Sequence, residues 1–168
     1  MNTTLNIFDE DGFIAILNAD KYHSFVDTDW ELEQLMTHFV NQMNCDTLVI
    51  WATNTQGGNW RVKFMDKPSS EKVYRQFNKT IQVTSGELYL TNYTDLTMAA
   101  QFADDKIPSK HNSNLLIKLP NGKYDLQVRQ MFDPVNFDNT SDPNIYEVVI
   151  SSADTKTETI DQVFWWTE

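Results

Sequence analysis

The sequence is poor in cysteine and glycine, and each shortage excludes a kind of protein. A single cysteine, Cys45, leaves no internal disulfide and no zinc site built from several cysteines, as is typical of a reducing compartment. The five glycines stand singly or as one pair, so they form neither a phosphate-binding loop nor a serine-hydrolase elbow. The three histidines lack metal-ligand spacing. We therefore predict no catalytic residue, no metal and no cofactor, and the sequence favours a protein that is not an enzyme.

Long apolar runs are also missing. No segment approaches the roughly 18 apolar residues that span a bilayer. The amino terminus has no basic stretch followed by an apolar one, which a secretion signal requires. We expect a cytoplasmic protein that does not bind membranes. The 168 residues suit one domain, 1–168, and a hydrophobic share of 40% is enough for a packed core.

Basic residues are scarce at both ends of the chain. Residues 1–46 hold nine acids and one base, and residues 133–168 hold eight acids and one base, whereas residues 47–132 hold seven acids and eleven bases. The net charge of −11 repels nucleic acids and speeds the encounter with basic proteins. We therefore predict a basic protein partner and no binding of nucleic acid.

One segment carries the periodicity of an amphipathic helix. Its apolar residues recur every three or four positions and form one stripe: Leu32, Leu35, Met36, Phe39, Val40 and Met43. Thr28 and Glu31 have the spacing of a capping box, and Asn44 is a suitable stop. We expect a helix over about 29–43 that packs its stripe against a β-sheet.

The rest of the chain has a period near two, which is typical of strands. Strand-like runs joined by short turns predict three hairpins: 47–54 with 59–66, 79–83 with 87–93, and 114–119 with 123–132. We interpret the Pro-Asn-Gly corner at 120–122 as a turn and not as a site, because proline fixes φ while asparagine and glycine tolerate positive φ. A further strand is expected over 145–151.

Other segments fit more than one structure. The ranges 69–77 and 94–105 are ambiguous, and either could be a helical turn. The range 157–168 fits a last strand or a short helix, and its adjacent aromatic residues favour a strand. In the loop that follows residue 132, Asp138 and Asp142 have the chemistry of calcium ligands, but loops with Asp-Pro pairs are common without metal, and we favour a metal-free loop.

The arrangement of these segments predicts the fold class. Successive hairpins with one covering helix indicate a mainly β, α+β protein. We expect an antiparallel β-sandwich or a partly open barrel, with the amphipathic helix packed on the sheet.

Acidic residues crowd the start of the expected helix. The helix dipole stabilises each carboxylate in the first turn by about 0.3–1 kcal/mol, which accounts for Asp29 and Glu31. It does not account for Asp27, Glu33 or the earlier Asp20. We interpret this surplus as a partner-binding surface that includes Asp20, Asp27, Asp29 and Glu33.

Two adjacent tryptophans near the end of the chain add one candidate. An extended backbone would turn Trp165 and Trp166 to opposite faces, so that one of them is exposed. Because exposed tryptophans often anchor interfaces, Trp166 joins the predicted partner-binding residues.

These observations favour a non-catalytic acidic domain, of the inhibitor or immunity type, that binds a basic protein. The alternative is an enzyme or a small-ligand-binding β-sandwich whose site is assembled from loops, with Asp104, Asp105, His111 and residues 133–142 as its lining. A third hypothesis is a subunit of a homo-oligomer that associates through the terminal aromatic residues.

Overall fold

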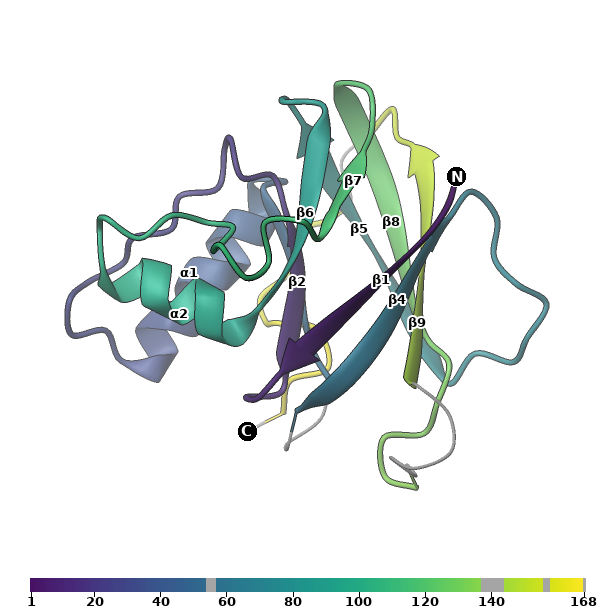
Figure 1. Ribbon diagram of the computed structural model, residues 1–168, viewed down its shortest axis with the longest axis horizontal. Helices are drawn as coiled ribbons and strands as arrows, with labels where there is room; N and C mark the ends of the chain where they lie inside the picture. Colours follow the sequence, from purple (N-terminus) through teal and green to yellow (C-terminus); the bar gives the residue numbers. More distant parts are fainter. Residues whose placement is uncertain (54–56, 137–143, 156–157, 168) are drawn as a thin grey trace.

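The computed structural model describes residues 1–53, 57–136, 144–155 and 158–167 and shows two β-sheets packed face to face. Two helices lie on the outer face of the second sheet (Figure 1). The predicted mainly β sandwich with a covering amphipathic helix is therefore confirmed. Within the described ranges, no helix is long and apolar enough to cross a bilayer.

The first sheet is mixed and has five strands. Their order is β1 (Asn2–Asp9), β4 (Gly58–Met65), β9 (Asn144–Ser152), β8 (Gly122–Gln130) and β5 (Arg75–Val83). The β4 and β9 strands pair in parallel, and the other neighbours are antiparallel. Trp60, Val62 and Phe64 are buried while Arg61 and Lys63 are partly exposed, so β4 has the one wet face that its alternation predicts.

The second sheet is antiparallel. Its order is β3 (Leu48–Ala52), β2 (Phe13–Leu17), β6 (Glu87–Asn92) and β7 (Leu116–Lys118). Every residue of β2 is buried, because one face of this strand meets the first sheet and the other lies beneath the helices. A strand that is buried on both faces has no alternation of apolar and polar residues. The sequence pattern therefore does not predict β2.

The three predicted hairpins are wrong as pairings, although the predicted strands are present on either side of each connection. Each connection carries the chain from one sheet to the other, as an arch: β3 and β4, β5 and β6, and β7 and β8 lie in different sheets. The apolar side chains of the joined strands therefore face one another across the core. A hairpin and an arch have the same alternation, so the pattern alone does not distinguish them.

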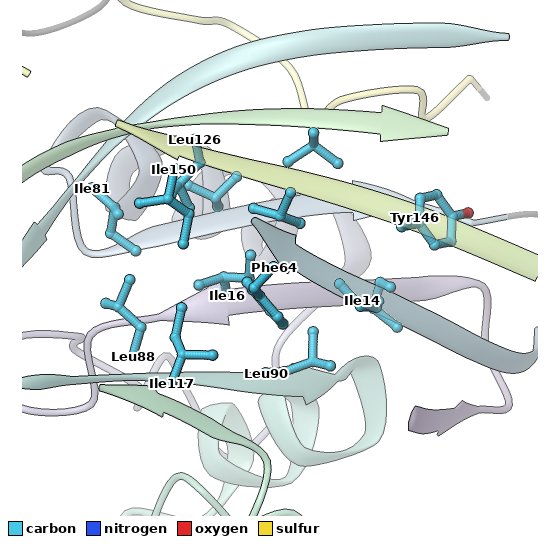
Figure 2. Packing of buried hydrophobic residues seen from close by; sticks show 14 of the residues in the cluster. Ile14, Ile16, Phe64, Ile81, Leu88, Leu90, Ile117, Leu126, Tyr146 and Ile150 are labelled. Atoms are coloured by element: carbon cyan, nitrogen blue, oxygen red, sulfur yellow. The ribbon is translucent and has the colours of Figure 1, made fainter. Parts of the chain in front are cut away.

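A large core fills the space between the sheets. Figure 2 shows Ile14, Ile16 and Leu90 of the second sheet opposite side chains of the first sheet. A second core joins the second sheet to helix α1 (Leu32–Asn44) through Leu35, Phe39 and other buried residues. Each such side chain contributes roughly 1.5–3 kcal/mol on burial, so packing and not intrinsic propensity holds this short helix.

The predicted helix is present but begins at Leu32, and the predicted Thr28–Glu31 capping box is wrong. Glu31 is the N-cap, and its backbone N–H donates to Gln34 Oε1 at 3.4 Å. The preceding residues are held in a turn by Asp27, whose Oδ1 accepts the Asp29 N–H at 3.1 Å. This turn keeps the segment from 28 to 30 out of the helix.

The segments that fit more than one structure have different outcomes. Helix α2 (Tyr93–Gln101) occupies most of 94–105, and the Asn92 side chain caps it by accepting the Asp95 N–H at 3.0 Å. The β5 strand begins inside 69–77, at Arg75. In the last segment, Phe164 forms a single parallel bridge with Trp51. The loop residues Asp138 and Asp142 lie outside the described residues.

Candidate functional site

The segment that connects β2 to α1 runs back along the helix and separates the predicted acidic residues. Near the end of α1, the Asn18 N–H donates to the Thr47 carbonyl at 3.0 Å, and the His23 N–H donates to Gln42 Oε1 at 3.1 Å. Near its start, the Val26 N–H donates to the Ala100 carbonyl at the end of α2, at 2.8 Å. A helix of 13 residues is about 20 Å long, so Asp20 lies far from the acids at the helix start.

The start of α1 gathers four exposed carboxylates, which we call the acidic edge: Asp27, Asp29, Glu31 and Glu33. The Asp27 carboxylate shapes the local turn, and Glu31 caps the helix. None of the four is in an ion pair with any residue that the structure describes. Their negative charge is therefore open to an external cation.

The neighbouring helix end makes the acidic edge more negative. The Asp27 N–H donates to the Ala100 carbonyl at 3.2 Å, so the carbonyl end of α2 lies beside the edge. A helix carries about half a negative charge at that end, and neither helix has a basic residue in its last turn. The exposed Asp104 and Asp105 lie three and four residues after the end of α2 and are followed by one exposed base, Lys106. This corner of the molecule thus collects negative charge that the described residues do not neutralise by ion pairs.

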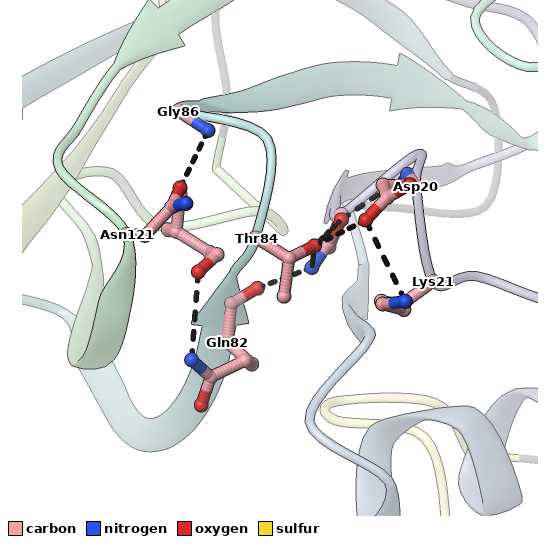
Figure 3. Close-up of polar contacts among 8 residues, drawn as sticks. Asp20, Lys21, Gln82, Thr84, Gly86 and Asn121 are labelled. Atoms are coloured by element: carbon pink, nitrogen blue, oxygen red, sulfur yellow. Dashed lines mark hydrogen bonds and ion pairs between the residues drawn. The ribbon is translucent and has the colours of Figure 1, made fainter.

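Asp20 has a structural role at the opposite end of α1. Figure 3 shows its carboxylate at the arch between β5 and β6, where it accepts the Thr84 hydroxyl at 2.7 Å. It also lies 3.8 Å from the Lys21 ammonium. The same arch is tied to the 120–122 corner, since Asn121 Oδ1 accepts the Gly86 N–H at 2.8 Å. The 120–122 corner, which connects β7 to β8, is therefore hydrogen-bonded to the arch between β5 and β6.

Other acids are removed from the surface altogether. Asp9 is buried and accepts four hydrogen bonds: Oδ1 from the backbone N–H groups of Asp11 and Gly12, each at 3.1 Å, and Oδ2 from the Thr53 hydroxyl at 2.9 Å and Trp60 Nε1 at 3.3 Å. Burial raises the pKa of Asp9, and these hydrogen bonds oppose the rise. Asp9 is one of the nine acids counted in residues 1–46, and the turn-forming Gly12 three residues later was a signal of its role.

Two further acids are also buried and paired with cations. Glu147 of β9 forms a buried ion pair with Arg129 of β8, the residue opposite it in the sheet. Asp46 lies 3.7 Å from the Lys123 ammonium. Some of the charge in the basic middle of the sequence therefore neutralises acids from the two ends.

Trp166 is half-buried. Its side chain packs against the second core, beneath the helices. Its backbone N–H donates to the Val163 carbonyl at 3.4 Å. Only part of the ring is available to a partner. The structure places Trp166 against this core, and its role as an interface anchor stays a prediction.

Exposed apolar residues accompany the helices. Leu32 of α1 is 50% exposed, and Met98 and Phe102 at the end of α2 are 45% and 47% exposed. Large apolar side chains that stay accessible beside charged residues are typical of protein-binding surfaces. Sequence reasoning missed all three. The helical spacing assigned Leu32 to the buried stripe, and Met98 and Phe102 lie in the range 94–105, which fitted more than one structure.

The residues of the alternative loop site are only partly described. Asp104, Asp105 and His111 are exposed on the connection between α2 and β7. Residues 137–143 lie outside the described ranges. Among the residues that are described, no group of three or more His, Cys, Asp or Glu side chains could hold a metal ion.

Comparison with known proteins finds a likeness of fold. No family model and no curated protein matches the chain. A solved structure described as crocagin biosynthetic gene J has a TM-score of 0.52 and 10% identity, covering 88% of this chain and 94% of that one. ComJ from Bacillus subtilis, an inhibitor of the DNA-degrading activity of NucA, has a TM-score of 0.52 and 14% identity, covering 90% of this chain and 96% of ComJ. The likeness extends over most of each chain, and at these identities it shows the fold alone.

Proposed function

We propose that this chain is a non-catalytic domain of the inhibitor or immunity type, which binds a basic protein through the acidic edge. The observation that carries the proposal is the gathering of four exposed carboxylates beside the negative end of α2, without an ion pair among the described residues. Like charges held this close repel one another, and a cationic partner relieves that repulsion.

The exposed apolar side chains give the proposed surface a source of affinity. Charge complementarity mainly speeds association and selects the partner, whereas buried apolar contacts supply most of the binding free energy. Leu32 lies within the acidic edge, and Met98 lies on the helix whose end adjoins it. A partner that covers both elements would bury apolar area and meet the carboxylates together.

The likeness to ComJ supports the same class of function. ComJ has a similar fold and inhibits a nuclease. Nucleases are commonly basic at the surfaces that bind DNA, since they must attract phosphate groups. The first partners to test are therefore the nucleases of the organism that encodes this chain.

The test is a DNA-degradation assay with each purified nuclease, with and without an excess of this chain, combined with calorimetric measurement of the Kd. We expect one nuclease to be inhibited stoichiometrically. Replacing Asp29 by Asn and Glu33 by Gln should weaken its binding at least about tenfold, because two charge pairs at an interface are lost. Raising the salt several-fold should weaken binding in the same direction.

The matched control removes two acids on the other side of the molecule. Glu71→Gln with Asp154→Asn gives the same net charge, and both residues are exposed and lie next to strands of the first sheet. This control should bind as the wild type does. If the two double variants bind equally, or if a partner binds without regard to salt, the acidic edge is not the binding surface.

A further inference from the structure

Three polar residues form a row across the first sheet at one end of the sandwich. Arg75 of β5 pairs with Gln130 of β8, and Gln130 pairs with Tyr146 of β9. Directly paired residues point to the same face of a sheet. Gln130 and Tyr146 are fully buried, so this row points into the sandwich. In Figure 2 the Tyr146 hydroxyl points away from the other labelled core residues.

The row presents hydrogen-bond donors that the protein leaves unused. Gln130 Oε1 accepts from Arg75 Nε at 2.6 Å, but Gln130 Nε2 and the Tyr146 hydroxyl have no hydrogen-bond partner. Trp51 Nε1, from the second sheet, makes no hydrogen bond of ordinary geometry but lies near enough to the Tyr146 hydroxyl to act on its pKa, and the two rings are 5.7 Å apart. A buried polar group without a partner is unfavourable, so the two neighbouring groups Gln130 Nε2 and the Tyr146 hydroxyl are unusual in a native core.

The electrostatics of the row favour an anion. Burial lowers the pKa of Arg75, and no ion pair joins its guanidinium to any residue within the described ranges. Burial raises the pKa of Tyr146 far above its usual range and the Asp9 carboxylate adds to this rise, while the Arg75 guanidinium and the Trp51 N–H oppose it. The Tyr146 hydroxyl therefore stays protonated and can donate. A positive charge beside several N–H and O–H donors matches a carboxylate, which accepts hydrogen bonds. A metal ion would instead need oxygen, nitrogen or sulfur atoms that supply lone pairs.

Aromatic rings enclose these donors. The Tyr146 ring has three further aromatic neighbours: Trp60 at 5.7 Å, Phe132 at 5.4 Å and Trp165 at 6.5 Å between ring centroids. Arg75 lies over the Trp165 ring at 4.3 Å. The walls of the row are thus suited to the flat apolar body of a ligand.

Trp165 contributes an independent sign of function. Its φ of 61° is in the left-handed region, which is unfavourable for a residue with a large side chain. Such outliers persist where surrounding contacts require them, and they are enriched at binding sites. Arg75, Phe132 and Trp165 are only partly buried, so these three side chains reach the surface at this end of the row.

From this arrangement we infer that this end of the sandwich binds a small aromatic carboxylate. The carboxylate accepts from Arg75 and Gln130, with the Tyr146 hydroxyl as a further donor, and the ring of the ligand packs among Phe132 and Trp165. This site uses none of the residues of the acidic edge, so it stands independently of the proposed function.

The test uses three probes with intact protein: phenylacetate, 3-phenylpropanoate and indole-3-acetate. Titration calorimetry and, for the two phenyl compounds, tryptophan fluorescence report binding, because Trp51, Trp60 and Trp165 lie at the site. We expect at least one probe to bind with a Kd of about 1 mM or below. Acetate, which lacks the ring, and phenylacetamide, which lacks the charge, should bind at least about tenfold more weakly than the best probe.

Two variants assign the binding to this row. Arg75→Gln should weaken binding of the best probe at least about tenfold, because it removes the charged donor. Tyr146→Phe keeps the ring and its packing and should weaken binding of that probe about threefold or more. Its far-ultraviolet circular dichroism should remain that of the wild type. Arg61→Gln, a partly exposed position on β4, is the matched control and should leave the Kd unchanged.

Three outcomes would overturn the inference. The first is that none of the probes binds. The second is that phenylacetamide binds as tightly as phenylacetate. The third is that Tyr146→Phe, with its fold intact, binds the best probe as the wild type does.

Discussion

The buried carboxylate of Asp9 offers the sharpest test of the structure. It ends β1 and accepts four hydrogen bonds where the chain crosses from the first sheet to the second. The change to examine is Asp9→Asn, which keeps the size of the side chain but removes its charge. If the structure is right, this neutral replacement destabilises the protein even though it removes a buried charge.

The magnitude follows from the two oxygens. The bonds to Oδ1, from Asp11 and Gly12, survive in asparagine. At Oδ2, the donors Thr53 Oγ1 and Trp60 Nε1 would face an NH2 group. Each bond to a charged acceptor contributes about 1.5–3 kcal/mol, and removing the desolvated charge offsets part of this loss, so we expect the free energy of unfolding to fall by about 2 kcal/mol.

The same residue should give a pH dependence. Burial raises the pKa of Asp9 above its ordinary value of 3.8, so the folded chain holds the proton to a higher pH than the unfolded chain does. The contribution of Asp9 to stability is therefore greatest below pH 3.8 and declines as the pH rises through the raised pKa. Asp9→Asn should lack this decline.

Urea unfolding, followed by circular dichroism at neutral pH and at several acidic values, measures both effects. Glu10→Gln is the control, because Glu10 is exposed next to Asp9, and it should change stability by less than about 0.5 kcal/mol. An Asp9→Asn variant as stable as the wild type at neutral pH would refute the convergence of four donors on this carboxylate.

Three further substitutions test other contacts by urea unfolding. Arg129→Met leaves Glu147 buried without its cation and should cost about 3–5 kcal/mol, and a loss below about 1 kcal/mol would show that Glu147 reaches solvent. Asn121→Ala removes the acceptor of the Gly86 N–H and should cost about 1 kcal/mol, whereas no loss would mean that the two arches are not coupled. Tyr146→Phe removes a buried hydroxyl that makes no hydrogen bond of ordinary geometry, so stability should stay equal or rise by up to about 1 kcal/mol, and a clear loss would mean that its contact with the Trp51 N–H is a stabilising hydrogen bond.

The sequence predicted the local features of this fold better than its pairings. The alternation around Trp60 and the helical stripe that contains Phe39 both report which side chains are buried, and both are confirmed except at Leu32, the first residue of the stripe, which is exposed. The choice between a hairpin and an arch depends on contacts with distant strands, which no local pattern records. The start of α1 moved to Leu32 because Asp27 forms a turn, and that competition between side chain and helix is hard to weigh from sequence.

The candidate surface was predictable only in part. The residues Asp27, Asp29 and Glu33 lie together because they are close in sequence. Asp20 was predicted with them, yet it bonds to Thr84 at the other end of α1, because the connecting segment reverses along the helix. The donors around Tyr146 come from strands distant in the sequence, so no spacing rule could have grouped them.

The position of β9 has a consequence for how the chain acquires its structure. This strand, the last one among the described residues, lies between β4 and β8, so the pair β1–β4 and the pair β5–β8 are separate ribbons until it enters. Contacts between residues far apart in sequence are slow to form. During synthesis the first sheet therefore stays in two halves until the ribosome has released the region around Tyr146, and a chain that stops before Asn144 should expose the facing edges of β4 and β8 to other molecules.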